Sequence, residues 1–589
     1  MPVGKRVDHL TGRDRCGFAP GMTQRADWGT LDPFYEGLAG KVVMGRPVAN
    51  AGFLEALLRR DPFPRYHFYL ESERLAAMQS QELERRHPTL HARGAFVVDT
   101  WAALPHALAT NRFHAFHLSD CHNRPGPMVR LRNLHAPDIF PITATTHSLS
   151  FQEFKRHVLA HLWQGVTPRD CTVCTSRAAE KVMQGYYGWL REAYGLGNAL
   201  FREPTLEIVP LGVEPKAYLV PAPAEKRQLR EMLAAYESDE KVQGGLAIPK
   251  DAVMLLALGR VSPGLKMDLL PVVRAVQRLV VEGRHPGSLC LVVAGSMPAK
   301  DPYLDLLQAL ARNIGLTVRR VPRPDEDLKR TLLAAADIFI SPSDNVQETF
   351  GLTILEAGAS GLPVIASDWD GYRDLVATEG ENATGILVRT FGRQEQSPMD
   401  DAMGSILPGD VHHLRLAQST AVDVAALARA IETLASDEPL RQAMGRRAHE
   451  RVTGQFSWDN VVERHLALWD ELWTRTVDED AARKATPPFE LPYGRIFGWH
   501  PSAKLNGLIV QTSRSGENVY RGREFPQVYA DLDGWLPEQA LKPLLVLARK
   551  PRPAAELVQR LAAAQSLTPE EAERLALWAL KHDLLEIVE

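Results

Sequence analysis

Short apolar runs alternate with longer amphipathic stretches through most of this chain. Short runs bounded by Gly, Pro, Ser or Asp are typical of buried strands. In the first part of the chain they lie at residues 41–45, 66–70, 95–98, 115–118, 142–145 and 170–176. Helical patterns separate them, as at residues 53–60, 102–109 and 178–187, and residues 46–52 are predicted to form a turn. Strands that alternate with helices predict an α/β fold with a doubly wound parallel sheet.

The same alternation starts again after a break at residues 208–214. Further strands are predicted at residues 253–258, 289–294, 317–321, 336–340, 364–366 and 385–388. Residues 390–420 are rich in Pro, Gly, Gln and Asp and are predicted to form an inserted surface loop. Helices are then expected at residues 424–434, 439–451 and 458–473. The chain is therefore expected to contain a second sheet of the same kind.

A further unit follows the helix breaker Pro487-Pro488. It is predicted to be mostly helical, and Thr568-Pro569-Glu570-Glu571 forms a capping box that opens its last helix. Its helices resemble a winged-helix or PqqD-like peptide-binding module, which we expect to help present an acceptor; packing against the other domains is the alternative. We thus expect an N-terminal arm (1–38), an N-terminal Rossmann-like domain (39–212), a C-terminal Rossmann-like domain (213–480) and an extension (485–589).

Composition excludes several classes of protein. The 68 basic and 72 acidic residues give a net charge of -4, which argues against nucleic-acid binding through bulk charge. No apolar run is long enough to cross a bilayer, so membrane contact is expected to be at most peripheral. Five cysteines and no recognisable signal segment in residues 1–18 predict a reducing, cytoplasmic location. Cys171 and Cys174 form an isolated C-x-x-C and are interpreted as buried strand cysteines rather than zinc ligands.

The most informative stretch is residues 340–358, which is predicted to form a strand, a loop and a helix. Phe350, Gly351 and Leu352 would open the helix, and a helix N-terminus favours bound anions such as phosphate. Glu348 precedes that helix and Glu356 lies inside it. Carboxylates accept hydrogen bonds strongly, so each could hold a sugar hydroxyl. The alternative is that Glu348 caps the helix and Glu356 faces solvent.

Two cations and a histidine follow other predicted strands. Arg260 and Lys266 lie on a loop after Gly259 and suit a diphosphate, although two surface cations are the simpler interpretation. His147 follows the strand at residues 142–145. Ligands of doubly wound sheets gather outside the carboxyl ends of the strands, but a histidine there is often structural.

Residues 40–475 resemble glycosyltransferase family 4, whose members are retaining enzymes with the GT-B fold of two Rossmann-like domains facing a cleft. The resemblance rests on the two glutamates around Phe350-Gly351-Leu352, on Gly259-Arg260 with Lys266, and on His147; the linker departs from it at Leu211 and Glu214. It implies that Arg260, Lys266, Glu348 and His147 are catalytic. It also implies substrate-binding roles for Gly45, Gly259, Thr349, Phe350, Gly351, Leu352 and Glu356.

The resemblance implies a hexosyltransferase that moves a sugar from a UDP-, GDP- or ADP-sugar to an acceptor glycan, small molecule, peptide or protein, with retention at the anomeric carbon. No metal or other cofactor is expected, and Asp368-Trp369-Asp370 is interpreted as loop structure rather than a metal site. Two alternatives stay open. One is a GT-B relative that is not a transferase, such as an epimerase or a phosphorylase. The other is a catalytically silent sugar-nucleotide sensor or scaffold.

Overall fold

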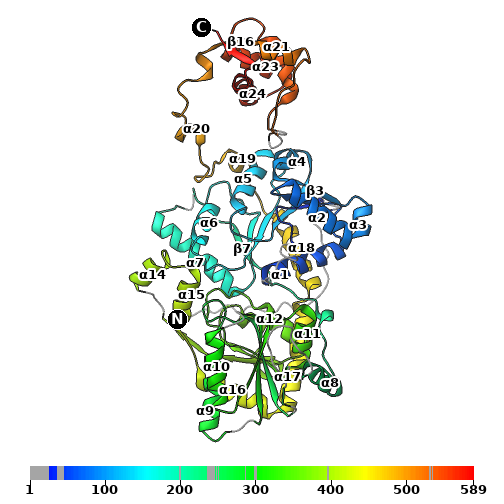
Figure 1. Ribbon diagram of the computed structural model, residues 1–589, viewed down its shortest axis with the longest axis vertical. Helices are drawn as coiled ribbons and strands as arrows, with labels where there is room; N and C mark the ends of the chain where they lie inside the picture. The colour runs from blue at the N-terminus through cyan, green and yellow to red at the C-terminus, as the bar shows by residue number, and fades with distance from the viewer. Residues whose placement is uncertain are drawn as a thin grey trace. The chain divides into compact units, whose positions relative to one another are not determined.

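The computed structural model describes residues 25–35, 45–197, 200–234, 246, 248–249, 251–284, 287–297, 301–393, 397–529, 532 and 535–588. The chain divides into two compact units, Met1–Pro488 and Phe489–Glu589. The first unit contains two parallel sheets, each flanked by helices (Figure 1). The second unit is a smaller body with its own core.

Among the described residues, the first sheet has seven parallel strands in the order β3-β2-β1-β4-β5-β6-β7. The strands are β1 (Asp27–Thr30), β2 (Tyr66–Leu70), β3 (Phe96–Thr100), β4 (Phe113–Leu118), β5 (Ile142–Thr145), β6 (Asp170–Cys174) and β7 (Thr205–Ile208). The helices are α1 (Gly45–Arg60), α2 (Glu73–Arg86), α3 (Pro88–Ala92), α4 (Leu104–Thr110), α5 (Pro125–His135), α6 (Phe154–His161) and α7 (Arg177–Tyr194). Cys171 and Cys174 are buried in β6, as predicted.

Within the described part of the chain, the second sheet has six parallel strands in the order β10-β9-β8-β11-β12-β13. They are β8 (Val253–Arg260), β9 (Leu289–Ser296), β10 (Thr317–Pro322), β11 (Ile338–Ser341), β12 (Val364–Ser367) and β13 (Gly385–Val388). The helices are α8 (Pro223–Ala234), α9 (Leu270–Val281), α10 (Pro302–Arg312), α11 (Glu326–Ala335), α12 (Leu352–Ala359), α13 (Tyr372–Leu375), α16 (Val424–Ser436) and α17 (Glu438–Gln455). Two doubly wound domains joined in this way form the GT-B arrangement, which confirms the predicted fold class.

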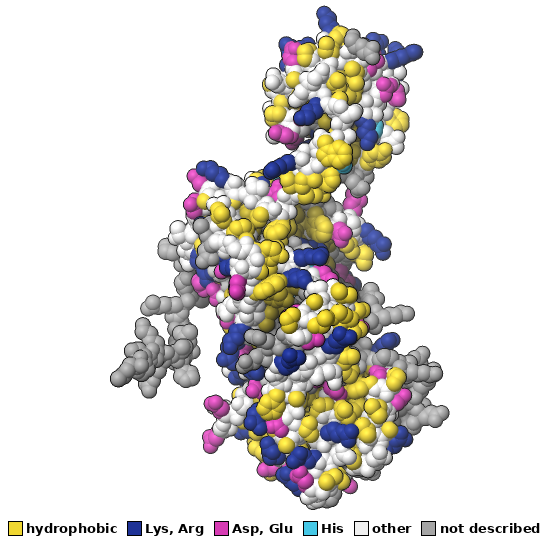
Figure 2. Space-filling model, turned by 90° about the vertical axis from the view of Figure 1, so that its left-hand side faces the viewer, with side chains coloured by type: hydrophobic (Ala, Val, Ile, Leu, Met, Phe, Trp, Pro, Cys, Tyr) yellow, Lys and Arg dark blue, Asp and Glu magenta, His cyan; other side chains and the backbone are white. Residues whose placement is uncertain are grey.

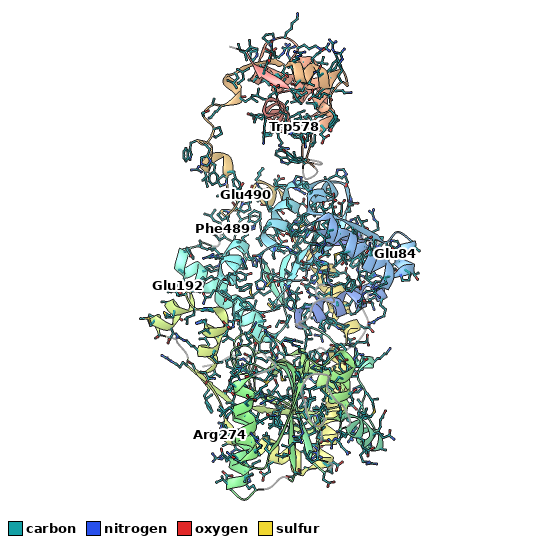
Figure 3. The ribbon with its side chains drawn as sticks, viewed as in Figure 1. Glu84, Glu192, Arg274, Phe489, Glu490 and Trp578 are labelled. Carbon is teal, nitrogen blue, oxygen red and sulfur yellow. The ribbon has the colours of Figure 1, made fainter. Side chains whose placement is uncertain are left out.

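Alternating burial explains why these segments form the centre of the second sheet. Leu255 and Leu291 pack into one hydrophobic core, while Met254 and Val292, their neighbours along the strands, pack into the core on the other face. Both faces are apolar because helices cover both. Helices on the outside are amphipathic: Glu84 on α2, Glu192 on α7 and Arg274 on α9 point to solvent (Figure 3).

The beginning of the first domain differs from the prediction. Asp27–Thr30 is a central strand between β2 and β4, so this part of residues 1–38 is not an arm. The strand was missed because it is short and begins with a carboxylate, which is buried and accepts a hydrogen bond from His67 at 2.9 Å. The predicted turn at residues 46–52 is also wrong, because α1 begins at Gly45 and has Pro47 in its first turn. Residues 41–44 of the predicted first strand lie outside the described residues.

Helix α18 (Trp458–Thr474) follows the second domain in sequence but packs against the first domain. It packs against α1, and Trp469 Nε1 donates to Thr143 Oγ1 at 3.0 Å. Its continuation, α19 (Glu479–Lys484), also contacts that domain: Arg483 Nη1 donates to the Ala136 carbonyl at 2.8 Å. The predicted boundaries of 213–480 therefore combine segments that pack in different domains.

The predicted surface loop at residues 390–420 is instead a folded arm. It contains β14 (Thr390–Gly392), α14 (Pro398–Gly404), α15 (Gly409–Ala417) and β15 (Thr420–Val422). The strands pair antiparallel and bring both ends of the arm together. Ser397 caps α14 by accepting a hydrogen bond from the Asp400 amide, and Pro398 occupies the first turn. This helix start was missed because the segment around it is polar.

The C-terminal unit combines a small antiparallel sheet with helices. The sheet order is β17-β16-β18. The strands are β16 (Ile509–Thr512), β17 (Arg552–Pro553) and β18 (Leu585–Ile587), and the helices are α20 (Tyr493–Ile496), α21 (Arg514–Tyr520), α22 (Leu541–Leu547), α23 (Ala554–Gln565) and α24 (Pro569–Lys581). Thr568 and Glu571 form the predicted capping box, and Trp578 is buried in the core of the unit. The winged-helix or PqqD-like resemblance and the acceptor role stay predictions.

The surface agrees with the balanced charge of the sequence. On the face drawn in Figure 2, Lys and Arg alternate with Asp and Glu around apolar side chains. Over the described part of the chain, no helix has the length and apolar character needed to cross a membrane.

The buried pair of Arg132 and Asp170 gives a stability prediction for the first domain. Arg132 is fully buried, lies 3.0 Å from Asp170 through Nη2 and Oδ2, and donates to the Phe140 carbonyl at 2.7 Å. Arg132→Met leaves the Asp170 carboxylate buried without its cation, and we expect it to cost about 3–5 kcal/mol of unfolding free energy. Scanning calorimetry would detect the earlier unfolding transition.

A matched control is Arg85→Met, because the Arg85 side chain is 64% exposed and pairs with Glu82 on the helix surface. We expect this variant to unfold at the wild-type temperature. Equal transition temperatures for Arg132→Met and Arg85→Met would contradict the role assigned to the buried pair.

Candidate functional site

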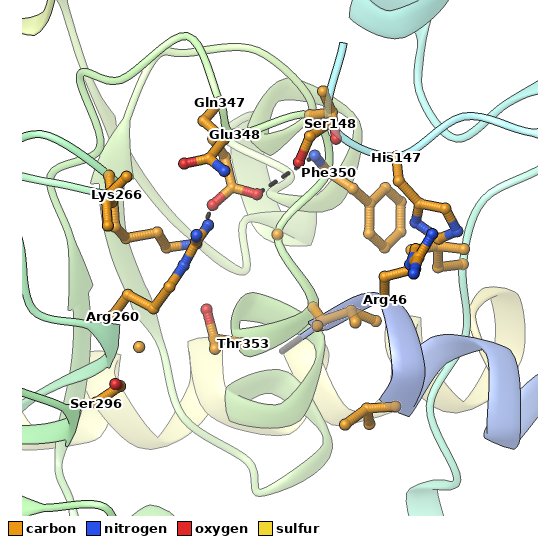
Figure 4. Close-up of a pocket in the computed structure, with 18 of the residues that line it drawn as sticks. Arg46, His147, Ser148, Arg260, Lys266, Ser296, Gln347, Glu348, Phe350 and Thr353 are labelled. Carbon is orange, nitrogen blue, oxygen red and sulfur yellow. Dashed lines mark hydrogen bonds and ion pairs between the residues drawn. The ribbon is translucent and has the colours of Figure 1, made fainter. Parts of the chain in front are cut away.

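One cavity of about 960 Å³ lies between the two sheets of the first unit. Every site residue predicted from the sequence lines it, namely Gly45, His147, Gly259, Arg260, Lys266, Glu348, Thr349, Phe350, Gly351, Leu352 and Glu356. Figure 4 shows Arg260, Lys266 and Glu348 on one side of the cavity, and His147 and Arg46 on the facing side. The structure thus brings together residues that are up to about three hundred positions apart in sequence.

The topology explains why the basic residues meet the glutamate loop. Strands β8 and β11 are neighbours in the sheet although two strands separate them in sequence, so the strand order reverses between them. Ligands of doubly wound sheets bind outside the carboxyl ends of strands at such a reversal. Arg260 ends β8, Lys266 follows on its loop, and Glu348 lies on the loop after β11.

Lys266 and Glu348 form a buried ion pair, with side chains only 12% and 11% exposed. Burial and the nearby Arg260 lower the pKa of Lys266 to about 7, although the carboxylates of Glu356 and Asp370 oppose that shift. Burial also lowers the pKa of Arg260. Two cationic groups therefore share a corner where water screens them poorly, and an anionic ligand beside them would favour their charged forms.

The loop that carries Glu348 is held by Tyr372. The Tyr372 hydroxyl donates to Glu348 Oε2 at 3.3 Å and is 2.8 Å from Ser341 Oγ. Gly351, at the start of α12, has a left-handed φ of 110°, and a Cβ there would lie 2.6 Å from the Tyr372 ring. Only glycine combines this conformation with this contact. The turn therefore places Glu348 and the first turn of α12 side by side.

Glu356 is buried within α12 and has two partners. It accepts hydrogen bonds from the Tyr218 hydroxyl at 3.1 Å and from Lys329 Nζ at 2.9 Å. Lys329 also donates to Glu326 at 2.9 Å. Burial opposes the charge of Lys329, but Glu356 and Glu326 together keep its pKa above the ordinary value. The alternative in which Glu356 faces solvent is wrong, because its side chain is fixed against the cavity wall.

His147 is buried at the cavity wall of the first domain. Its Nε2 lies 2.9 Å from the Ser119 carbonyl, so Nε2 carries the donated proton and Nδ1 is an acceptor. Burial lowers the pKa of His147 to about 4, with Arg46 adding to the shift and Asp120 opposing it. The imidazole is therefore neutral near pH 7.

The first-domain wall contains ion pairs that sequence reasoning missed. Arg46 Nη1 lies 2.8 Å from Asp120 Oδ2, and His122 contacts the same carboxylate. Arg124 pairs with Asp32, which also accepts from the Ser119 amide at 2.8 Å. These residues lie on three separate segments, namely the segment after β1, the start of α1 and the β4–α5 loop, so no local pattern joins them. Asp120 and Arg124 do follow β4, and that position was the one available signal.

Two carboxyl groups with raised pKa values lie on the loops that follow β11 and β12. Burial raises the pKa of Asp344 to about 8, with the Asp268 carboxylate adding to the shift. Burial also raises the pKa of Asp370, the last residue of the D-x-D tripeptide, to about 7. Asp368 instead pairs with Arg373 at 2.6 Å. Within the described residues, no group of three His, Cys, Asp or Glu side chains is arranged to hold a metal ion.

Comparisons with known proteins agree with this geometry. Residues 252–396 match the family model "Glycosyl transferases group 1". A D-inositol 3-phosphate glycosyltransferase of Kineococcus radiotolerans is 31% identical over 252 residues, 41% of this chain and 49% of that protein. The lipopolysaccharide core biosynthesis glycosyltransferase LpsE of Rhizobium meliloti is 28% identical over 223 residues, 38% of this chain and 51% of that protein. The chain thus spans about half the length of these curated relatives.

The chain also resembles solved structures, at low sequence identity. Anabaena HepE in complex with UDP and glucose has a TM-score of 0.46 and 15% identity, and the comparison covers 76% of this chain and all of HepE. A glycosyltransferase from Rickettsia africae has a TM-score of 0.47 and 15% identity, with 77% and 100% coverage. The family match is thus confined to residues 252–396, which lie in the second domain.

Proposed function

We propose that the chain transfers a hexosyl group from a nucleotide diphosphate sugar to an acceptor hydroxyl, with retention at the anomeric carbon. The observation that carries the proposal is the arrangement at the reversal of the second sheet. There Arg260, Lys266 and the start of α12 surround one corner of the cavity, and Glu348 and Glu356 lie beside it. Positive charge next to two fixed carboxylates suits a diphosphate between a ribose and a sugar.

In the proposed reaction the bond between the anomeric carbon and the diphosphate oxygen breaks, and a bond from that carbon to the acceptor oxygen forms. The acceptor proton passes to the released diphosphate. Arg260 and Lys266 stabilise the negative charge that grows on the leaving group, because fixed donors act strongly where water is excluded. Glu348 holds hydroxyls of the donor sugar and Glu356 holds those of the ribose. His147, neutral and fixed by the Ser119 carbonyl, lies on the facing wall beside the sugar.

The first-domain wall favours an uncharged acceptor. Its two arginines are each neutralised, Arg46 by Asp120 and Arg124 by Asp32. His147 is neutral, so this wall offers no excess of positive charge for a phosphate group. Among glycans, small molecules and peptides, the proposal therefore favours acceptors whose reacting part is a neutral hydroxyl compound.

A panel of UDP-, GDP- and ADP-sugars, each with and without a chelator, tests the proposal. We expect one donor to release its nucleotide slowly to water and faster with a hydroxyl acceptor, at equal rates in chelator because the basic pair supplies the positive charge. Product without free nucleotide would favour an epimerase, and sugar phosphate formed with inorganic phosphate would favour a phosphorylase. Binding without turnover of any sugar would favour a sensor. Loss of activity in chelator that manganese restores would reject metal independence.

The two glutamates should separate nucleotide binding from transfer. Glu356→Ala removes the proposed ribose acceptor, and we expect calorimetry to show weaker binding of the free nucleoside diphosphate by about 1.5–3 kcal/mol. Glu348→Ala should leave that affinity nearly intact and lower the transfer rate. Glu326→Ala, which also removes a partner of Lys329 but lies at the exposed rim, is the control. Equal nucleotide affinities for the Glu356 and Glu348 variants would contradict the assignment.

The lowered pKa of Lys266 predicts a pH dependence of nucleotide binding. Below pH 7 the free site already carries the ammonium, so affinity should be constant with respect to this group. Above pH 7 the free site loses that proton, and binding of an anion must take one up again. Affinity should then fall by up to about tenfold per pH unit. Calorimetry between pH 7 and 9 measures this directly.

Lys266→Arg is the matched variant, because its guanidinium stays charged over the whole range. We expect its affinity to be flat between pH 7 and 9, whatever its absolute value. A wild-type affinity that is equally flat would contradict the role of Lys266 as a titrating anion ligand.

A further inference from the structure

The arm formed by residues 390–422 is rooted in the second domain. Its strands β14 and β15 pair with Thr390 opposite Val422 and Gly392 opposite Thr420. At the root, the Asp423 amide donates to the Arg389 carbonyl at 2.9 Å, and Thr390 Oγ1 donates to the Asp368 carbonyl at 3.0 Å. The root is therefore fixed to the end of β13, and the two helices extend from it.

The helices of the arm reach the first domain at the β5–α6 loop (residues 146–153). His413 on α15 is 1% exposed, and its Nε2 lies 3.2 Å from the Ser150 carbonyl. The rings of His413 and Phe151 are 5.6 Å apart. Lys155, at the start of α6, donates to Ser405 Oγ at 3.4 Å. Because His413 is buried although the arm is inserted at the surface, the arm packs closely against the first domain here. We call the contact of His413 with Ser150 and Phe151 the anchor.

The same helices touch the loop that carries the basic pair, the β8–α9 loop (residues 261–269). A Cβ added to Gly264 would lie 3.0 Å from the Asp410 carbonyl oxygen and 3.4 Å from Leu414 Cβ. The arm therefore packs directly against this loop two residues before Lys266. Figure 1 shows α14 and α15 beside the junction of the two domains.

Both loops contacted by the arm line the cavity. Ser148, Phe151 and Glu153 come from the β5–α6 loop, and Leu265 and Lys266 come from the β8–α9 loop. These loops belong to different domains, so any motion between the domains changes their separation. An element that packs on both can hold them at the distance at which the reacting atoms meet and water is kept out.

We propose that the arm couples these two loops and so determines how often the sugar passes to the acceptor rather than to water. His413 is the positioning residue: it acts through the Ser150 carbonyl on the β5–α6 loop, whose Ser148 and Phe151 line the cavity, and does not touch the substrate. The inference rests on the proposed function only for its transfer readout. The coupling of the loops is a property of the protein without substrate.

Hydrogen exchange on the full chain without ligand tests the coupling. His413→Ala removes the anchor, and we expect faster amide exchange both in residues 148–155 and in residues 261–266. The control is His412→Ala on the same helix, whose ring packs against Gly404 of the arm itself; it should leave both loops at the wild-type rate. Faster exchange confined to the arm, or no change in either loop, would overturn the coupling.

A partition measurement tests the consequence for transfer. With the donor found in the panel, the ratio of sugar transferred to sugar hydrolysed should fall about tenfold or more in His413→Ala, because small misplacements of reacting groups are costly. Nucleotide affinity should stay within about twofold, since Arg260, Lys266 and Glu356 are unchanged. A merely structural role would lower stability without changing the partition ratio.

Replacing residues 393–419 by Asn-Gly gives a second variant. The two-residue turn would join β14 and β15 as a tight hairpin and remove both helices. It should show the same loss of transfer relative to hydrolysis, and an unchanged ratio in both variants would overturn the proposal. If the wild type turns over no nucleotide sugar, the proposed function fails, whereas hydrogen exchange still decides the coupling.

Discussion

The buried contact between Lys266 and Glu348 is the interaction on which the site depends. It joins the loop after β8 to the loop after β11, two strands that are adjacent only because the order of the sheet reverses there. Burying an ammonium and a carboxylate costs desolvation free energy, which their attraction repays only with good geometry. Tyr372 supplies part of that geometry by donating to Glu348. The pair therefore links the two loops, and it also places an ammonium and a carboxylate where a ligand can contact them.

On the proposed function, a ligand phosphate would compete with Glu348 for Lys266. In the free protein Glu348 contacts the ammonium, and burial with Arg260 lowers the lysine pKa. An anion at the same corner adds negative charge and favours the ammonium, while Glu348 becomes available to a hydroxyl. The same residues can thus serve the free and the occupied site, because the loop that carries Glu348 is fixed by Gly351 and Tyr372 rather than by the ion pair alone.

Contacts between the two domains fix the position of the first-domain wall, which faces Glu348 across the cavity. Ser176 Oγ donates to the Thr349 carbonyl at 2.9 Å, and the Arg177 amide donates to Asp374 Oδ2 at 2.7 Å. Both contacts come from the start of α7 in the first domain. One reaches the Glu348 loop, and the other reaches α13, whose Tyr372 donates to Glu348. Helix α18 and the arm add further crossings between the domains. The cavity is consequently shaped by segments from both domains.

Much of this could be predicted from the sequence. Buried strands such as β5 and β13 were predicted with their exact bounds, because apolar runs bounded by turn residues are a local signal. The Glu348 to Glu356 stretch and the Arg260 to Lys266 loop were recognisable because each lies within a few residues of sequence. Their presence in one cavity followed from the doubly wound topology.

The rest was decided by tertiary structure. In strand β1 the buried Asp27 accepts a hydrogen bond from His67, and Glu356 is fixed by Tyr218 and Lys329. These partners are remote in sequence. The ion pairs of the first-domain wall join three separate segments. The arm was mistaken for a loop because its polar composition hides two helices, which are packed by contacts with loops of both domains. Local sequence determines elements and short motifs, whereas partners distant along the chain are chosen by the fold, since only folding brings their charges and apolar surfaces within contact distance.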